Sequence, residues 1–241
     1  MPFGFFFDPT MLLLIPALLF AGWAQLKVKS TYAKFSQVGT RSGLSGAEVA
    51  ARILRDSGID LSDSPSSNPG RPACGLEAIP GELTDHYDPR DRVLRLSDGI
   101  YSGRSVAALG IAAHEVGHAV QHARAFAPLM LRNVVYPVCS FGSMLAWPLF
   151  FVGFFFHIKI LIPLGIALYI LAVFFTVLTL PVEFDASRRA LKCLSSGGYL
   201  TTDELAGARK VLTAAALTYV AATAMAILEL VRMLILARGR D

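Results

Sequence analysis

Cysteine is scarce in this sequence, and its scarcity argues against two kinds of protein. The 241 residues include three cysteines, Cys74, Cys139 and Cys193, and no two of them form a C-x-x-C pair. A disulfide framework and a thiolate zinc site are therefore not indicated, since both need cysteines at characteristic spacings. Three unpaired thiols, one of them within a long apolar run, fit a reducing compartment.

Charged residues are also few, which argues against an ordinary soluble domain. Only 17% of the residues are charged and 54% are hydrophobic, a composition typical of membrane proteins. The formal net charge of +4 does not point to a nucleic-acid partner, because lysines and arginines beside membrane segments face anionic lipid. The lipid bilayer is thus the expected partner, and no nucleic-acid partner is expected.

Four apolar segments are long enough to cross a bilayer, which needs roughly 20 apolar residues per helix. The second and third are separated only by residues 157–159, so a tight transmembrane hairpin is predicted. The fourth is interrupted near its end by Glu229 and Arg232, and it either spans the membrane or ends in an interfacial turn. The four segments cover residues 9–26, 134–156, 160–180 and 211–237.

Positive charges indicate the orientation of the chain. Lysines follow the first apolar segment instead of preceding it, so residues 1–26 are predicted to be an uncleaved signal-anchor helix. Residues 27–127 hold twelve lysines and arginines and residues 181–210 hold five, whereas residues 1–8 and 157–159 hold one together. The positive-inside rule places both large polar segments in the cytoplasm.

The polar segment between the first two spans begins with a short amphipathic helix, predicted over residues 46–57. Ser45 and Glu48 have the spacing of a capping box, and Gly58 suits the position after a helix end. The apolar face that would pack on the rest of the protein consists of Val49, Ile53 and Leu54.

Two further elements are predicted before the chain turns helical at about Ser102. Residues 61–75 are rich in serine, proline and glycine, and this composition predicts a mobile loop. Residues 81–99 give two short extended runs on either side of "DPR", which is the pattern of a β-hairpin.

The helix that follows carries the motif "HEVGH". His114 and His118 are four residues apart, so their imidazoles lie on one face of a helix and can converge on one metal ion. Glu115 is placed to reach a water molecule on that metal, as in the H-E-x-x-H motif of zinc metalloproteases. A glutamate flanked by two histidines in an apolar helix is costly, which favours a functional role over mere packing. The residues around the motif are small and would let another element approach closely: Ala112, Ala113, Gly117 and Ala119.

A catalytic zinc ion needs a third protein ligand. His122 lies two helical turns, about 12 Å, from the first histidine of the motif and is too far away to share the ion. The metzincin pattern fails as well, because Gln121 and Arg124 stand at its glycine and histidine positions. The segment after the third span should start a new helix at about Pro181. It offers Glu183, at the membrane boundary, with Asp185 as its rival. Position favours Glu183, but the residues alone leave the choice open.

Four separated blocks together resemble one protein family: "LTDHYDPRDRVLRLS", "AAHEVGHAVQHA", "LPVEFDASRRA" and "ALTYVAA". They are similar, over nearly the whole chain, to the bacterial membrane neutral zinc metallopeptidases of the YugP-like family. A more distant similarity is to the HtpX-type membrane proteases and the CAAX prenyl proteases. The resemblance implies a Zn²⁺ ion held by His114, His118 and Glu183, with Glu115 as general base, which is a gluzincin arrangement.

The more distant families suggest further features around the metal. They have an E-x-x-x-D motif whose glutamate is a ligand, and Ser187 here replaces its aspartate, so Asp185 is a candidate for that aspartate's role. An edge strand before the zinc helix would hold an extended substrate, and residues 91–97 are the predicted platform. His86 and Tyr87 are the candidate donors of a hydrogen bond to the oxyanion, and a structural role beside the turn is the alternative for both.

We therefore expect a mainly α-helical integral membrane protein with about four transmembrane helices and a cytoplasmic gluzincin-like zinc peptidase domain that includes a short β-hairpin. The expected activity is endopeptidase cleavage of membrane or juxtamembrane proteins at the inner (plasma) membrane of a bacterial cell. The alternatives are a site-2-type intramembrane protease and a non-catalytic helical membrane protein. The expected segments are a signal-anchor helix (1–26), a cytoplasmic catalytic segment (27–133), a transmembrane hairpin (134–180), a cytoplasmic segment with the third ligand (181–210) and a C-terminal transmembrane or interfacial helix (211–241).

Overall fold

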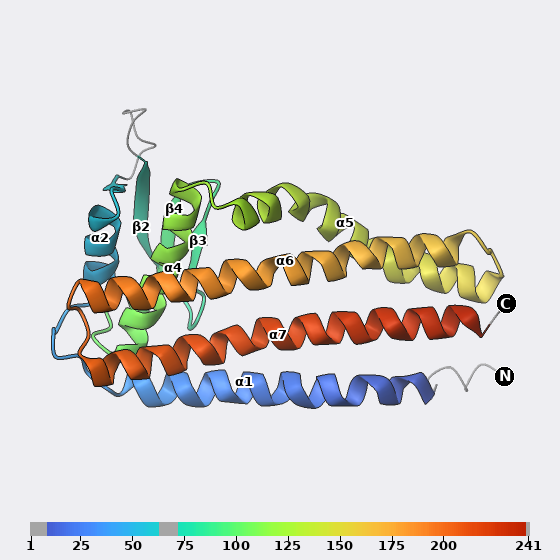
Figure 1. Cartoon of the computed structure of the whole chain (residues 1–241), viewed down its shortest axis with the longest axis horizontal. Helices are drawn as coiled ribbons and strands as arrows, with labels where there is room; N and C mark the ends of the chain where they lie inside the picture. The colour runs from blue at the N-terminus through green and yellow to red at the C-terminus, as the bar shows by residue number, and fades with distance from the viewer. Residues whose placement is uncertain (1–8, 63–71, 240–241) are drawn as a thin grey trace. The chain divides into compact units, whose positions relative to one another are not determined.

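A computed structural model describes residues 9–62 and 72–239, and most of these residues are helical (Figure 1). The mainly helical fold with a small sheet that the sequence predicts is confirmed. Most of the predicted loop 61–75 lies outside the described residues. The elements are η2 (Pro9–Leu14, a 3₁₀ helix), α1 (Ile15–Ser36), α2 (Gly46–Asp56), β1 (Asp60–Leu61), β2 (Ala73–Ile79), β3 (His86–Asp88), β4 (Val93–Ser97), α3 (Asp98–Tyr101), α4 (Val106–Ala123), α5 (Ala127–Phe156), α6 (Leu161–Ser196) and α7 (Thr202–Arg238).

The chain divides into two compact units, each made from separate parts of the sequence. The first, here called the apolar unit, contains Met1–Gln25, Leu131–Pro181 and Leu217–Asp241. The second, here called the mixed unit, contains Leu26–Met130 and Val182–Ala216. The helices α1, α5, α6 and α7 contribute residues to both units, whereas the sheet, α2, α3 and α4 belong to the mixed unit.

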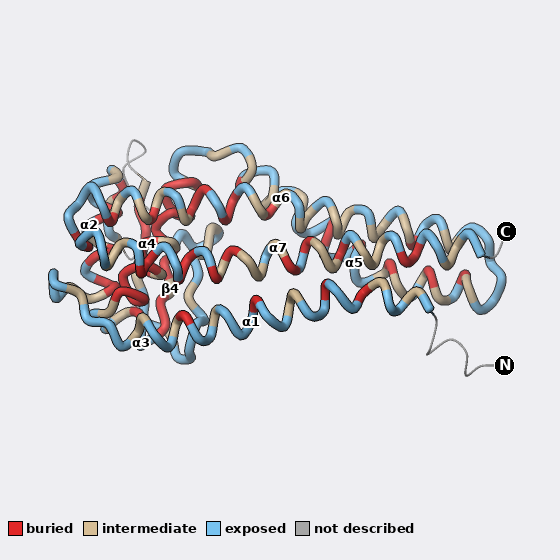
Figure 2. The backbone as a smooth tube through the Cα atoms, turned by 60° about the horizontal axis from the view of Figure 1, so that its bottom comes forward, coloured by how far each residue is buried: buried red, intermediate tan, exposed pale blue. Residues whose placement is uncertain are grey.

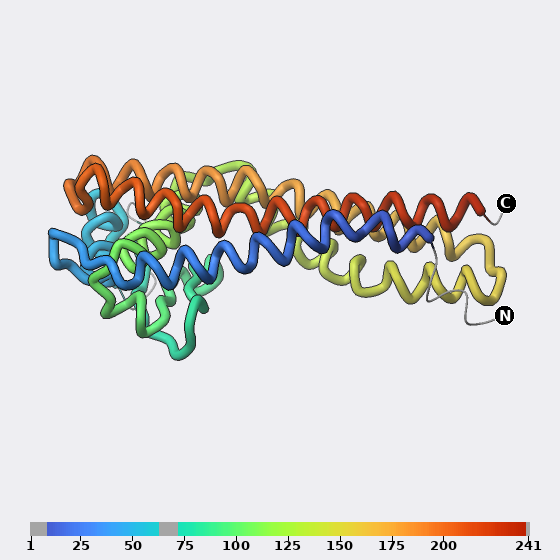
Figure 3. The backbone as a smooth tube through the Cα atoms, turned by 90° about the horizontal axis from the view of Figure 1, so that it is seen from below, coloured from blue at the N-terminus to red at the C-terminus, as the bar shows by residue number. Residues whose placement is uncertain are grey.

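The prediction of four candidate membrane spans is confirmed. Within the apolar unit, α5 and α6 form the predicted helical hairpin around the short turn 157–160 (Figure 3). A Cβ at Gly165 would lie 2.7 Å from the carbonyl oxygen of Ala146, so glycine permits this close approach. Large apolar side chains of α5 such as Val134 and Val138 stay 73% and 63% exposed, as lipid-facing side chains do. The helices long and apolar enough to cross a membrane are Pro9–Ser36, Ala127–Phe156, Leu161–Ser196 and Thr202–Arg238.

The two charges that interrupt the fourth apolar segment pair with each other inside the apolar unit. Arg232 lies 3.1 Å from Glu229 Oε1, and its Nε–H donates to the Thr10 hydroxyl at 3.2 Å. The guanidinium also lies 5.8 Å from the ring centroid of Trp147. These contacts offset the cost of burying the charges, and α7 continues as one helix to Arg238.

The helix α6 continues through Pro181, where the sequence predicts the start of a new helix. That prediction is wrong because a proline removes only one backbone hydrogen bond, and apolar helices tolerate prolines when neighbouring groups compensate. Glu183 therefore lies on the same continuous helix as the third apolar segment.

The mixed unit contains a four-stranded sheet in the order β1-β2-β4-β3. The strands β3 and β4 pair antiparallel, which confirms the predicted hairpin, and β4 also pairs in parallel with β2. The prediction that residues 91–97 form the exposed edge is wrong, because β4 has a strand on each side, and the edge strand is β3. The sequence does not predict β2, because the first residues of this strand, 73–75, belong to the serine-, proline- and glycine-rich stretch that predicts a loop.

The helix α2 packs on α4 and supplies part of a core whose buried residues gather around α2, α4 and β4 (Figure 2). The predicted capping box is present: the Ser45 N–H donates to Glu48 Oε2 at 2.7 Å, and the Glu48 N–H donates to Ser45 Oγ at 3.2 Å. The helix α4 begins a few residues later than predicted, after the N-cap Ser105. The predicted apolar face of α2 is buried: Val49, Ile53 and Leu54. This core holds the motif helix α4 in place.

Candidate metal centre

Two helices of the mixed unit supply three candidate metal ligands. His114 and His118 lie one turn apart on α4, and Glu183 lies on α6. The ligand atoms of the three side chains all lie within 4.8 Å of one another. Glu183 is buried, with 3% of its surface exposed, and both histidines are partly buried. The group is therefore positioned to bind a metal ion.

The distances within the group fit a zinc ion. Glu183 Oε2 lies 3.4 Å from His114 Nε2 and 3.7 Å from His118 Nε2, which is too long for normal hydrogen bonds. Two atoms bound to one tetrahedral zinc ion at about 2.0–2.1 Å are themselves about 3.3–3.4 Å apart. Glu183 Oε2 is buried and makes no hydrogen bond with a described residue, which is costly for a carboxylate unless a cation satisfies it.

His114 has a partner at the ring nitrogen that faces away from Glu183. The hydroxyl of Ser187 lies 3.1 Å from His114 Nδ1. When this hydroxyl accepts a hydrogen bond from Nδ1–H, the Nε2 lone pair is available to a metal. Ser187 thus contacts a candidate ligand from the position where the motif of the more distant families has an aspartate, whereas Asp185 contacts Gln121.

His118 is held by Gln121, whose side chain is completely buried on α4. The amide nitrogen of Gln121 donates to the Val182 carbonyl at 2.8 Å and to Asp185 Oδ2 at 2.9 Å. The amide oxygen therefore faces His118 Nδ1, at 3.1 Å, and because it can only accept, Nδ1 carries the proton. This tautomer leaves Nε2 available to a metal. Asp185, which also pairs with Arg189, acts on the second histidine through Gln121 and is not one of the three grouped ligands.

The position of α6 against α4 depends on Gly117. A Cβ on Gly117 would lie 2.7 Å from the carbonyl oxygen of Ala186 and 3.1 Å from its Cα. These are backbone atoms, so they could yield only if α6 moved. The prediction that small residues let another element approach the motif is confirmed, and the element is α6, which brings Glu183 to the histidines.

Glu115 lies next to the edge strand. It is 8% exposed, and its Oε2 accepts a hydrogen bond from the Tyr87 N–H at 3.0 Å. The Tyr87 phenol lies 2.8 Å from His122 Nδ1. Burial raises the pKa of Tyr87, whereas burial and the nearby charge of Arg92 lower the pKa of His122. Both rings are therefore neutral, and we assign the phenol as the donor because it is a stronger acid than an imidazole N–H. His122 lies outside the ligand group as predicted.

His86 lies on β3 and is exposed. Its Nδ1 is 2.9 Å from the carbonyl oxygen of Thr84, which can only accept, so Nδ1 carries a proton. Its Nε2 can donate a hydrogen bond only when the ring is protonated. Within residues 9–62 and 72–239, no hydrogen bond or ion pair joins His86 to the candidate ligands or to Glu115.

Comparison with known proteins leads to the same chemistry. A family model described as "Putative neutral zinc metallopeptidase" matches residues 10–238. The chain belongs to this family. "Putative membrane protease YugP" from Bacillus subtilis (strain 168) is 47% identical over 230 residues, which cover 95% of this chain and 97% of that protein. No solved structure matches the chain significantly. The family resemblance seen in the four sequence blocks is therefore confirmed.

Sequence reasoning missed three contacts around the candidate ligands. In the sequence Gln121 stands out only as a departure from the metzincin pattern, although an amide three residues after His118 on an apolar helix is a usable signal. In the sequence Ser187 is visible only as the replacement of an aspartate. The Tyr87 N–H has no sequence signal, because every residue except proline carries such a donor.

Proposed function

We propose that this protein is an integral membrane zinc endopeptidase that hydrolyses peptide bonds of membrane or juxtamembrane proteins. One observation carries the proposal: a buried oxygen of Glu183 faces two imidazole nitrogens at 3.4 and 3.7 Å without a hydrogen bond. A cation would satisfy all three atoms at once. We assign His114, His118 and Glu183 as ligands and Glu115 as the general base.

Each group of the site has a distinct part in the proposed reaction. Zinc, when bound, supplies the Lewis acidity that polarises the scissile carbonyl and activates the attacking water. Glu115 takes a proton from that water and passes it to the leaving amine. The hydrogen bond from the Tyr87 N–H holds Glu115 Oε2, so we assign Oε1 to the proton transfer. Ser187 and Gln121 keep the two imidazoles oriented.

The edge strand β3 is the proposed platform for the substrate, in place of residues 91–97. An extended peptide can add to a sheet edge through main-chain hydrogen bonds, and β3 lies beside Glu115 because Tyr87 bonds to it. His86 on the same strand is the proposed donor to the oxyanion, and its imidazolium form has the necessary Nε2–H.

We further propose that the active site faces the cytoplasm, in a gluzincin-like domain at the inner (plasma) membrane of a bacterial cell. The excess of lysine and arginine in the two large polar segments supports this orientation. In this arrangement residues 27–133 and 181–210 are cytoplasmic, and residues 1–26, 134–180 and 211–241 form the membrane part, the last as a transmembrane or interfacial helix.

Two other functions are less well supported. A site-2-type intramembrane protease needs its motif within a membrane span, whereas the four candidate spans among the described residues lie on helices other than α4. A non-catalytic helical membrane protein would have no need of a buried carboxylate oxygen that faces two histidines.

The test compares zinc content and proteolysis in variants of the full chain. Glu115→Gln retains the three ligands, so it should keep about one zinc per chain while cleavage of an unstructured test protein falls by at least about a hundredfold. His114→Ala, His118→Ala and Glu183→Ala should each lose zinc and activity.

Glu77→Gln is the matched control, because Glu77 is an exposed glutamate of the same unit, and it should keep both zinc and activity. Full cleavage by Glu115→Gln would refute the role of the base. Undiminished zinc in Glu183→Ala would refute the third ligand.

A further inference from the structure

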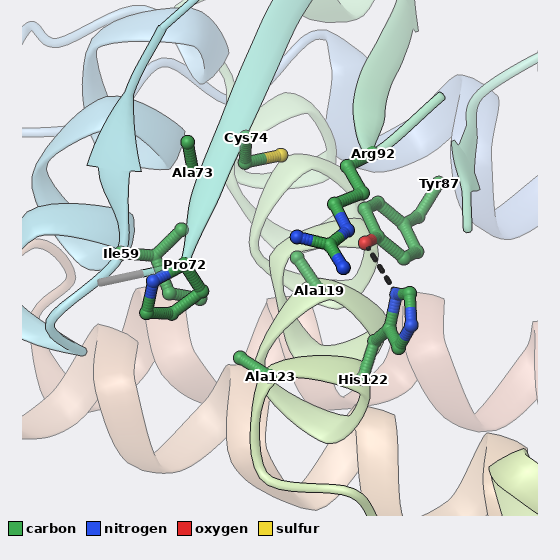
Figure 4. Close-up of a pocket in the computed structure, with 9 residues that line it drawn as sticks. All are labelled: Ile59, Pro72, Ala73, Cys74, Tyr87, Arg92, Ala119, His122 and Ala123. Atoms are coloured by element: carbon green, nitrogen blue, oxygen red, sulfur yellow. Dashed lines mark hydrogen bonds between the residues drawn. The ribbon is translucent and has the colours of Figure 1, made fainter. Parts of the chain in front are cut away.

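A cavity of about 150 Å³ lies beside the C-terminal half of α4 in the mixed unit (Figure 4). Six of the nine residues that line it are apolar, and they come from Ile59, the start of β2 and alanines of α4. Three polar side chains, Tyr87, Arg92 and His122, complete the lining. Such a combination of apolar residues and a few convergent polar groups is typical of ligand sites.

Arg92 differs from Arg95, on the same hairpin, in lacking an acidic partner. Arg95 pairs with Glu77, Asp88 and Asp91 at 3.2, 2.7 and 2.7 Å. The Arg92 side chain makes no hydrogen bond or ion pair with any residue that the structure describes, and Figure 4 shows it directed into the cavity. Acids of β2 and of the hairpin thus neutralise Arg95, and the charge of Arg92 remains unpaired at the cavity.

The backbone of Arg92 holds its side chain there at a conformational cost. Its φ is +56°, in the left-handed region that favours glycine or asparagine. Its carbonyl accepts a hydrogen bond from the Gly75 N–H at 2.9 Å, which fixes the residue against β2. Sparsely populated backbone conformations collect at functional sites, so a long charged side chain at this position suggests a use for the charge.

The cavity shares residues with the candidate active site. Tyr87 contributes its phenol to the cavity and its main-chain N–H to Glu115. His122 lies one helical turn, about 6 Å, beyond His118 on α4. Because its Nδ1 accepts from the Tyr87 hydroxyl, the neutral ring carries its proton on Nε2 and offers one further donor (Figure 4). The α4 residues that line the cavity thus lie within about one helical turn of the candidate ligand His118.

We propose that this cavity is a substrate subsite in which Arg92 binds a carboxylate of the peptide. The proposal rests on the proposed peptidase function. The carboxylate belongs to an aspartate or glutamate side chain or to the end of the peptide, and in each case its two oxygens match the fork of the guanidinium. The apolar lining residues contact the methylene groups of the peptide residue that carries the carboxylate. Arg92 is thus a residue that determines specificity.

The test uses the full chain in detergent. Its substrates are pairs of unstructured peptides that differ only by having glutamate or glutamine at one position within a few residues of the cleaved bond. Binding is measured with Glu115→Gln, which does not turn the peptides over, and cleavage is measured with the wild type. At one position the glutamate peptide should bind about tenfold more tightly, and be cleaved about tenfold faster, than the matching glutamine peptide. A second pair, with a free or an amidated carboxyl terminus, separates the two sources of the carboxylate.

Arg92→Gln should abolish the preference in both measurements, and Arg92→Lys should keep part of it. Arg90→Gln is the matched control, because Arg90 is exposed in the same hairpin turn and does not line the cavity. Zinc content verifies that each variant is folded. An unchanged preference in Arg92→Gln, or no preference for either kind of carboxylate in the wild type, overturns the proposal. If the wild type cleaves no peptide while Glu115→Gln still discriminates, the peptidase function fails and the subsite stands.

Discussion

Gln121 connects two helices that are far apart in the sequence, and its role explains what sequence could predict at the scale of residues. The i and i+4 histidines were predictable because a helix alone sets their spacing. The role of Gln121 depends on Val182 and Asp185, more than 60 residues away, and on the approach of α6. Asp185 is a rival to Glu183 in the sequence for the same reason. Spacing along the chain does not show whether its carboxylate would bind the metal or, as the structure has it, bind Gln121, which contacts His118.

Replacing Gln121 by methionine should weaken zinc binding. Gln121→Met has a similar volume but leaves His118 Nδ1–H and the Val182 carbonyl without their partner, so the imidazole loses its fixed tautomer. Losing such a partner typically lowers metal affinity about 10–100-fold. The measurement is competition for zinc against a chelator of known affinity.

Val120→Ala is the control for this variant. Val120 is the buried neighbour of Gln121 on α4, and its truncation removes packing without touching a hydrogen bond of the ligands. Val120→Ala should lower stability by about 1 kcal/mol and leave zinc affinity unchanged. Wild-type zinc affinity in Gln121→Met would show that the amide does not position His118.

At the scale of elements, the helices and turns that depend on nearby residues could be predicted, whereas the pairing of segments distant in the sequence could not. The helix α2 followed from its capping box and its apolar face, both contained within a dozen residues. The strand β2 pairs directly with β4 in parallel, although β3 lies between them in the sequence. No local pattern predicts such a pairing. The effect of Pro181 could not be predicted from its sequence neighbours, because it depends on whether groups packed around the helix compensate the lost hydrogen bond.

The packing of α6 on α4 can be tested at Gly117. Gly117→Ala would place a methyl group 2.7 Å from the backbone oxygen of Ala186, so α6 must move, and with it Glu183. We expect a loss of stability of about 1–3 kcal/mol together with loss of zinc, measured by thermal unfolding and metal content.

Gly110→Ala is the matched control, because Gly110 lies on the same helix two turns earlier. A Cβ there would meet the Cβ of Ala208 at 3.4 Å, an ordinary contact, and alanine is the better helix former. This variant should keep its zinc and remain within about 1 kcal/mol of the wild-type stability. Normal zinc binding by Gly117→Ala would show that the helices do not need this close approach.

At the scale of the whole molecule, the sequence carries two kinds of information that do not depend on tertiary contacts. The apolar runs predicted four candidate spans because crossing a bilayer sets a minimum length for each helix. The division into an apolar and a mixed unit brings together segments that lie far apart in the chain. The charge asymmetry between the segments that flank the spans predicts a direction of insertion, which the fold alone does not carry.

This direction can be tested with single cysteines in a chain from which Cys74, Cys139 and Cys193 have been removed. Glu82→Cys lies in the mixed unit and Ile160→Cys lies in the turn between α5 and α6, and both positions are exposed and leave every lysine and arginine in place. In intact spheroplasts a membrane-impermeant maleimide should label Ile160→Cys but not Glu82→Cys, because the positive-inside rule puts the mixed unit in the cytoplasm. Both should react after permeabilisation, which controls for access. Labelling of Glu82→Cys in intact spheroplasts would reverse the orientation and place the candidate zinc site outside the cell.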